Sequence, residues 1–198
     1  MLTGAVESID SQGVEEVPVT ARIRRGVLAA GLCVLMACTG CASPSTAFSV
    51  DGTPVSQAQV DQVAASCQKA FNQGATTPIS LADMRVQSVQ WQLGGTIGEV
   101  VAKRLSVTFS QDDLLTVINQ SPNGPALMRD ALCQQTMYNF ATAAVLRYQV
   151  GAAQFAAQVA KLNIEVNPRY GSFDPSSFIS TGNGLTGAGS LSQLAGNS

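Results

Sequence analysis

The clearest pattern in the chain is a helical stripe of apolar residues that begins after Ser56. Ser56 is followed three residues later by Gln59, which is the spacing of a capping box at a helix N-terminus. The apolar residues downstream recur every three or four positions and predict an amphipathic helix; they are Val60, Val63, Ala64, Cys67, Ala70 and Phe71. The preceding Phe48-Ser49-Val50-Asp51-Gly52 predicts a short strand and a tight turn. Pro54 lacks an N–H and is expected to lead the chain out of any strand ladder.

Two further helices are predicted between residues 80 and 119. Ser80 with Asp83 gives a similar cap spacing, and the helix that follows is expected to run to about Leu105. Its apolar stripe consists of Val86, Val89, Leu93, Ile97, Val100 and Val101. This stripe is interrupted by three glycines, Gly94, Gly95 and Gly98. Each lowers helix stability by about 1 kcal/mol relative to alanine. They fit either a kink in the helix or a close crossing with another helix. Ser110 with Asp113 predicts the cap of a shorter third helix.

The second half of the body also has helical periodicity until a short terminal strand. A long fourth helix is predicted from about Ala126 to Gln149, with a stripe of Cys133, Met137, Phe140, Ala144 and Tyr148. Gly151 is expected to bend the chain into a last helix, Ala152 to Leu162. Ile164-Glu165-Val166 then predicts a strand, which we expect to pair with Phe48-Ser49-Val50 and close the two ends of the fold. The expected fold is mainly all-α, with about five helices and short terminal strands.

The first 40 residues have the pattern of an export signal. Residues 22–25 form a basic segment, and Gly26 to Ala37 is an apolar run of about a dozen residues, short of the roughly 20 that span a bilayer. The small residues that follow resemble the bacterial lipobox, in which a cysteine receives a lipid. Cys41, preceded by two small residues, is the favoured lipid acceptor, and Cys38 is the alternative. An uncleaved membrane anchor or a buried core helix is the other interpretation of the apolar run.

These patterns divide the chain into four parts. Residues 1–40 form the signal region, whose polar and acidic residues 1–21 are attributable to a start codon placed too far upstream. Residues 41–46 are a tether and residues 47–175 the helical domain. Residues 176–198 are a Gly/Ser-rich tail that we expect to be disordered. Whether export uses the general secretory or the twin-arginine route stays open, because adjacent arginines are common in signal regions.

Charge and composition exclude some classes of function. Charged residues make up 12% of the chain, its net charge is −2, and it contains no histidine. Eight basic and nine acidic residues follow Cys41, so the exported part is close to neutral and carries no electrostatic footprint for nucleic acid. The lack of histidine removes the commonest general base and metal ligand. Since no catalytic constellation is found either, we expect no enzyme activity, no metal and no cofactor.

Two cysteines and one tryptophan in the helical body are candidates for structural or binding roles. If Cys41 is lipidated, Cys67 and Cys133 are the thiols that remain, and both lie on apolar helix stripes. In an oxidising compartment such a pair predicts a disulfide between the first and fourth helices, with two ordinary buried thiols as the alternative. Trp91 lies off the main stripe of its helix. It is either a client-binding aromatic on an exposed groove or a packing anchor on a second face.

Three segments resemble the SurA-type N-terminal chaperone domain and lipoproteins that carry it. Residues 47–56 are similar to the strand, turn and helix cap with which this family begins. Residues 105–114 are similar to a later family segment, although leucines replace the usual glycine and valine at its two ends. Residues 166–174, which contain Asn-Pro-Arg-Tyr-Gly, are similar to the terminal signature of actinobacterial lipoproteins with such a domain. Together these segments extend the resemblance over roughly residues 47–174.

The resemblance implies an extracytoplasmic, chaperone-like helical module that binds polypeptides. In SurA this domain precedes a parvulin prolyl-isomerase domain. We expect no such domain here, so neither isomerase activity nor any catalytic residue is carried over. We therefore expect a lipoprotein held at the cell membrane by its lipid, whose partners are unfolded or newly exported polypeptides. A non-catalytic envelope scaffold with one specific partner is the alternative.

Overall fold

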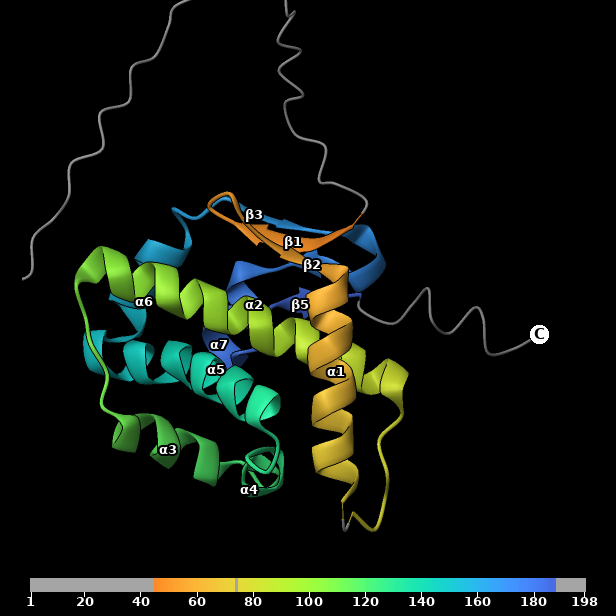
Figure 1. Cartoon of the computed structure of the whole chain (residues 1–198). Coiled ribbons are helices and arrows are strands. Elements are labelled where there is room, and N and C mark those ends of the chain that lie inside the picture. Colours follow the sequence, from red (N-terminus) through yellow and green to blue (C-terminus); the bar gives the residue numbers. More distant parts are fainter. Residues whose placement is uncertain (1–44, 74, 188–198) are drawn as a thin grey trace, which may run out of the picture. The chain divides into compact units, whose positions relative to one another are not determined.

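Short strands bring the two ends of the domain together. The computed structural model describes residues 45–73 and 75–187 (Figure 1). Its strands form a three-stranded antiparallel sheet, β2 (Thr53–Ser56), β1 (Thr46–Val50) and β3 (Ile164–Val166), and a two-stranded one, β4 (Ser172–Phe173) and β5 (Leu185–Thr186). β1 is the middle strand of the larger sheet, and Phe48 on it faces Val166 on β3. The predicted pairing of these two strands is therefore confirmed.

The turn between β1 and β2 is tied to the rest of the domain. Asp51 and Gly52 have φ values of 49° and 77°, as a tight hairpin turn requires. The Asp51 carboxylate accepts a hydrogen bond from the backbone N–H of Asn163 (2.9 Å) and forms an ion pair with Arg104. Pro54 stays inside β2, so the prediction that it leaves the ladder is wrong. β2 is an edge strand, where a missing N–H is tolerated.

Helices make up most of the described residues. They are α1 (Gln57–Asn72), α2 (Leu81–Leu105), α3 (Gln111–Gln120), α4 (Gly124–Leu127), α5 (Ala131–Val150), α6 (Ala152–Val159), the 3₁₀ helix η1 (Pro168–Tyr170) and α7 (Pro175–Thr181). α1, α2 and α5 pack against one another, and α3 packs along α5 (Figure 1). The predicted caps are present, since Ser56, Ser80 and Ser110 each accept a hydrogen bond from the N–H three residues on. No helix in this part of the chain has the length and apolar character to cross a membrane.

The predicted fourth helix is in fact two helices. α4 ends at Leu127 and α5 begins at Ala131. Between them Asp130 has an extended backbone, and its carboxylate accepts hydrogen bonds from the N–H groups of Leu132 (3.0 Å) and Cys133 (3.3 Å). The prediction of one continuous helix from residue 126 is wrong because Asp130, near the start of that stretch, caps a new helix. This split and the additional α7 explain why the structure has more than the five or so predicted helices.

The glycines of α2 mark a close helix crossing and not a break in the helix. α2 is continuous through all three of them. A Cβ atom placed on Gly98 would lie 2.7 Å from the backbone nitrogen of Ala143 on α5, and one on Gly95 would lie 3.0 Å from the backbone of Asn139. Such distances leave room only for hydrogen, so glycine lets the two helices approach each other closely.

The predicted disordered tail over residues 176–198 is wrong for its first part. α7 and β5 occupy this stretch as far as residue 186. Phe178 is buried, and its ring centroid lies 6.1 Å from that of Phe155 on α6. Leu185 is buried as well. Two apolar side chains therefore hold a segment whose Gly/Ser-rich composition alone favoured disorder. Residues 188–198 lie outside the described residues.

Candidate functional site

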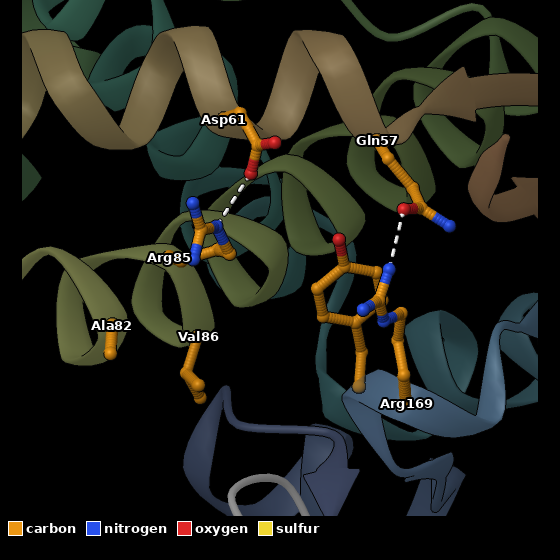
Figure 2. Close-up of a pocket in the computed structure, with 7 residues that line it drawn as sticks. Gln57, Asp61, Ala82, Arg85, Val86 and Arg169 are labelled. Carbon is orange, nitrogen blue, oxygen red and sulfur yellow. Dashed lines mark hydrogen bonds and ion pairs between the residues drawn. The ribbon is translucent and has the colours of Figure 1, made fainter. Parts of the chain in front are cut away.

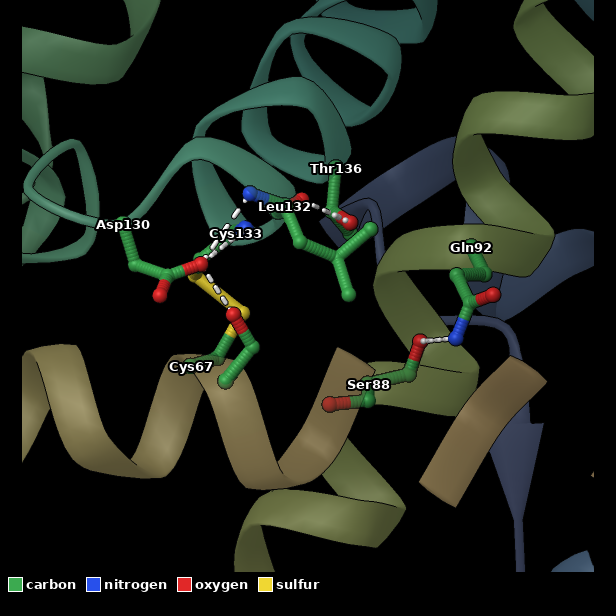
Figure 3. The surroundings of a disulfide bond; sticks show 8 residues. Cys67, Ser88, Gln92, Asp130, Leu132, Cys133 and Thr136 are labelled. Carbon is green, nitrogen blue, oxygen red and sulfur yellow. Dashed lines mark hydrogen bonds between the residues drawn. A yellow bond between two sulfur atoms is a disulfide. The ribbon is translucent and has the colours of Figure 1, made fainter. Parts of the chain in front are cut away.

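A disulfide joins Cys67 on α1 to Cys133 on α5, which confirms the predicted pair (Figure 3). The two Cα atoms lie 5.0 Å apart, and both residues are fully buried. The bond lies in an apolar cluster that also contains Val63, Met84 and Met137. Reactive cysteines in proteins have solvent access and an electropositive setting. We therefore interpret this disulfide as a structural cross-link between two helices that are far apart in the sequence.

Asp130 links the same two helices beside the disulfide (Figure 3). The Ser66 hydroxyl on α1 donates a hydrogen bond to the Asp130 carboxylate. This bond lowers the pKa of Asp130 below its ordinary value of 3.8, and the N–H groups of Cys133 and Leu132 act in the same direction. The carboxylate is thus held in its charged form as a helix cap. It supports the fold and is not suited to act as a general acid at neutral pH.

Trp91 occupies a packing environment. It is partly buried and packs against the apolar cluster around the disulfide. It does not line the groove that lies between α3 and α5. This environment matches the packing-anchor alternative for Trp91 and gives no support to the client-binding one. The two lipidation candidates, Cys41 and Cys38, lie outside the described residues.

A groove of about 600 Å³ runs between α3 and α5. We call it the α3–α5 groove, and its lining residues are Asp113, Thr116, Val117, Gln120, Ala144, Val145, Tyr148 and Gln149. Tyr148 is 90% exposed, although it is a large aromatic residue. Within the described residues, Leu81 at 38% is the other exposed large hydrophobic side chain. The groove therefore holds the most exposed aromatic surface in this part of the chain.

The chemistry of the α3–α5 groove suits a polypeptide. Val117 and Val145 supply apolar contact, and the amides of Gln120 and Gln149 supply both hydrogen-bond donors and acceptors. Asp113 is the one charged lining residue, and its carboxylate is already engaged by the hydroxyl of Ser110 (2.7 Å) at the cap of α3. A nearly neutral surface with apolar and amide groups matches a peptide segment, whose backbone needs both kinds of contact.

The helical spacing puts Tyr148 on one apolar stripe with Cys133, but the structure buries only the N-terminal part of this stripe. Ala143 and Leu146 are buried, whereas Ala144 and Tyr148 are exposed. The close crossing with α2 at Ala143 determines which side of α5 is covered there. The stripe therefore stops being buried halfway along the helix. The sequence signal that points to this change is the glycine-rich segment of α2, but it does not identify the residue on α5 that it meets.

Comparison of the chain with protein-family models, with curated proteins and with solved structures finds no match. The resemblance to the SurA-type domain thus rests on its three short segments alone. Within residues 45–73 and 75–187, no three histidine, cysteine, aspartate or glutamate residues are grouped as metal ligands would be.

The α3–α5 groove, with the exposed Tyr148 in its lining, is therefore the candidate binding site.

Proposed function

We propose that this chain is a membrane-anchored extracytoplasmic lipoprotein whose helical domain binds polypeptides, without catalysing a reaction, through the α3–α5 groove. The observation that carries this proposal is Tyr148, 90% exposed on the wall of that groove. Tyrosine is favoured at binding hot spots because it offers a rigid apolar ring and a polar hydroxyl. The clients in this proposal are unfolded or newly exported chains, as the SurA-type resemblance implies.

A second candidate function is a scaffold that holds one specific partner. It is favoured by the scarcity of exposed apolar surface, since Tyr148 and Leu81 are the exposed large hydrophobic residues within the described part of the chain. A chaperone that holds many unfolded clients is expected to present a broader apolar patch. One aromatic residue beside amide groups fits a defined partner sequence better than a range of unfolded chains.

The compartment in this proposal is supported by two independent features. Disulfides form and persist in oxidising compartments outside the cytoplasm, and the domain has a buried disulfide. The lipobox-like sequence around Cys41 supports attachment to the membrane through a lipid. The two features agree, although they come from different parts of the chain.

Photocrosslinking from the groove tests the binding proposal. A benzophenone amino acid placed at position 148 of the full chain is expected to give adducts with polypeptides in intact cells, because this side chain is already exposed. The same group at Leu81, the other exposed hydrophobic position, serves as the matched control and is expected to give few adducts.

Tyr148→Ser is expected to weaken binding of the captured polypeptide about tenfold while changing the free energy of unfolding by less than about 0.5 kcal/mol.

The adduct pattern also separates the two functions. Many adducts with newly exported chains support the chaperone-like function, whereas one dominant adduct supports the scaffold. Equal labelling from positions 148 and 81 would remove the α3–α5 groove from consideration as the binding site.

Membrane attachment is tested by substitution of the lipid acceptor in the full chain. Cys41→Ala is expected to abolish incorporation of labelled fatty acid and to move the chain from the membrane to the soluble fraction, since the lipid supplies the anchor. Cys38→Ala is the control and should retain both the label and the membrane location. The reverse result would assign the lipid to Cys38, and unchanged labelling in the double variant would show that neither cysteine is the acceptor.

A further inference from the structure

The Asn-Pro-Arg-Tyr-Gly segment forms a rigid corner against strand β1. The backbone N–H of Asn167 donates to the carbonyl of Ala47 (2.8 Å), and its side-chain amide donates to the carbonyl of Thr46 (3.0 Å). The Asn167 side-chain oxygen in turn accepts from the N–H of Arg169 (3.1 Å), which opens the 3₁₀ helix η1. These bonds fix the backbone of Arg169, so the direction in which its side chain leaves η1 is set by the sheet.

Arg169 lines a pocket of about 280 Å³ between α1, α2 and η1. Figure 2 shows Arg169 on one side of this pocket and Arg85, from α2, on the other, with Asp61 and Gln57 of α1 facing them. We call this space the arginine pocket. Val86 and Tyr170 also line the pocket. Two elements that are far apart in the sequence, α2 and η1, thus place one guanidinium group each around one small space.

Most hydrogen-bond donors of the two guanidinium groups have no protein partner among the described residues. A guanidinium has five N–H donors. The Nε of Arg85 contacts the Asp61 carboxylate at 2.5 Å, and one terminal nitrogen of Arg169 donates to the Gln57 amide oxygen at 2.9 Å. Within residues 45–73 and 75–187, Arg169 has no ion-pair partner, because its side-chain contact is to a neutral amide. The charged lining residues, two arginines and one aspartate, leave a net charge of +1.

We propose that the arginine pocket binds a single carboxylate of a polypeptide, either a C-terminal carboxylate or that of an acidic side chain. Guanidinium groups hold carboxylates through paired, charge-assisted hydrogen bonds. One net positive charge matches one carboxylate, whereas the nearby Asp61 disfavours a doubly charged phosphate. Val86 and the ring of Tyr170 provide apolar contact for the carbon atoms next to the carboxylate. The α3–α5 groove shares no residue with this pocket.

The arginine pocket is tested with short peptides and the full chain in detergent. Nitrogen-15 NMR of the arginine Nε–H groups is expected to show shifts at Arg85 and Arg169 with acetyl-Ala-Ala-Ala bearing a free C-terminus, with acetyl-Ala-Asp-Ala-amide, or with both. The neutral acetyl-Ala-Ala-Ala-amide should give no shifts. Shifts with the free C-terminus identify a C-terminal carboxylate as the ligand, and shifts with the aspartate peptide identify an acidic side chain. Arg169→Gln is expected to weaken binding about tenfold, and Arg147→Gln, on α5 and outside the pocket, should leave it unchanged.

A second variant tests whether the weaker binding of Arg169→Gln could result from a loss of folding. Asp61→Asn removes the negative charge beside Arg85 and is expected to tighten carboxylate binding about threefold. A general loss of structure would not produce a gain. The proposal is overturned by equal binding of charged and neutral peptides, by unchanged binding to Arg169→Gln, or by tighter binding of inorganic phosphate than of either carboxylate. The NMR shifts report on the arginine pocket alone, whereas the crosslinking reports on the α3–α5 groove. A negative result in one experiment therefore does not contradict the proposal that the other one tests.

Discussion

Reduction of the Cys67–Cys133 disulfide is expected to lower the melting temperature of the protein by about 10 °C. The bond closes a sequence separation of 66 residues, for which the chain-entropy treatment gives about 4 kcal/mol, while measured losses for native disulfides are about 2–5 kcal/mol. A loss of about 3 kcal/mol corresponds to the stated shift for a domain of this size. Calorimetry of the native protein with and without a thiol reductant measures it.

The double variant Cys67→Ala/Cys133→Ala is the control for the disulfide. It should melt near the temperature of the reduced protein and should not respond to the reductant. Alkylation of both thiols in the untreated native protein would contradict the presence of the bond. An unchanged melting temperature on full reduction would show instead that the packing of α1 on α5 does not need the cross-link.

Gly98→Ala is expected to lower the free energy of unfolding by about 2 kcal/mol. The new methyl group would meet the backbone nitrogen of Ala143 at 2.7 Å, and a backbone atom has no rotamer by which to move away. Overpacking of this kind costs about 1–3 kcal/mol, with the upper end expected here. Alanine returns about 1 kcal/mol through its higher helix propensity. Urea unfolding monitored by circular dichroism measures the difference.

Gly94→Ala on the same helix is the matched control. A Cβ atom at Gly94 would lie 3.4 Å from ring atoms of Phe140 and Phe178, which is ordinary contact with side chains. The helix-propensity gain should therefore dominate, and stability should rise by as much as about 1 kcal/mol. If the two alanine variants proved equally stable, the close crossing of α2 and α5 would not depend on Gly98.

The helix caps and the hairpin turn are predicted correctly because their signals are local. Ser56 and Gln59 define a helix start within four residues, and Asp51 with Gly52 defines a turn within two. The disulfide is predictable on the expectation of an oxidising compartment, in which two cysteines on apolar stripes are a candidate pair. Asp130 was missed because an aspartate inside an apolar periodic stretch looks like a surface residue until its two N–H partners are known.

The candidate sites depend on contacts that periodicity does not report. The exposure of Tyr148 follows from the way α2 crosses α5, and the helical stripe continues through Tyr148 regardless. The arginine pocket joins Arg85 to Arg169 across 84 positions of sequence, with Asp61 from a third element. The sequence of the Asn-Pro-Arg-Tyr-Gly segment predicts a turn and resembles a lipoprotein signature. That its arginine faces α1 and α2 is a property of the packed fold.

The central position of β1 has a mechanical consequence. The chain ahead of Ser45 joins the domain at β1, which is hydrogen-bonded to β2 on one side and to β3 on the other. A pull on that chain is therefore shared at once between both ladders, one of which leads to the C-terminal end of the domain. The strand cannot be peeled away as an edge strand is, by opening one row of bonds after another. The end of the domain that would bear the load of a membrane attachment is also the most strongly integrated part of its sheet.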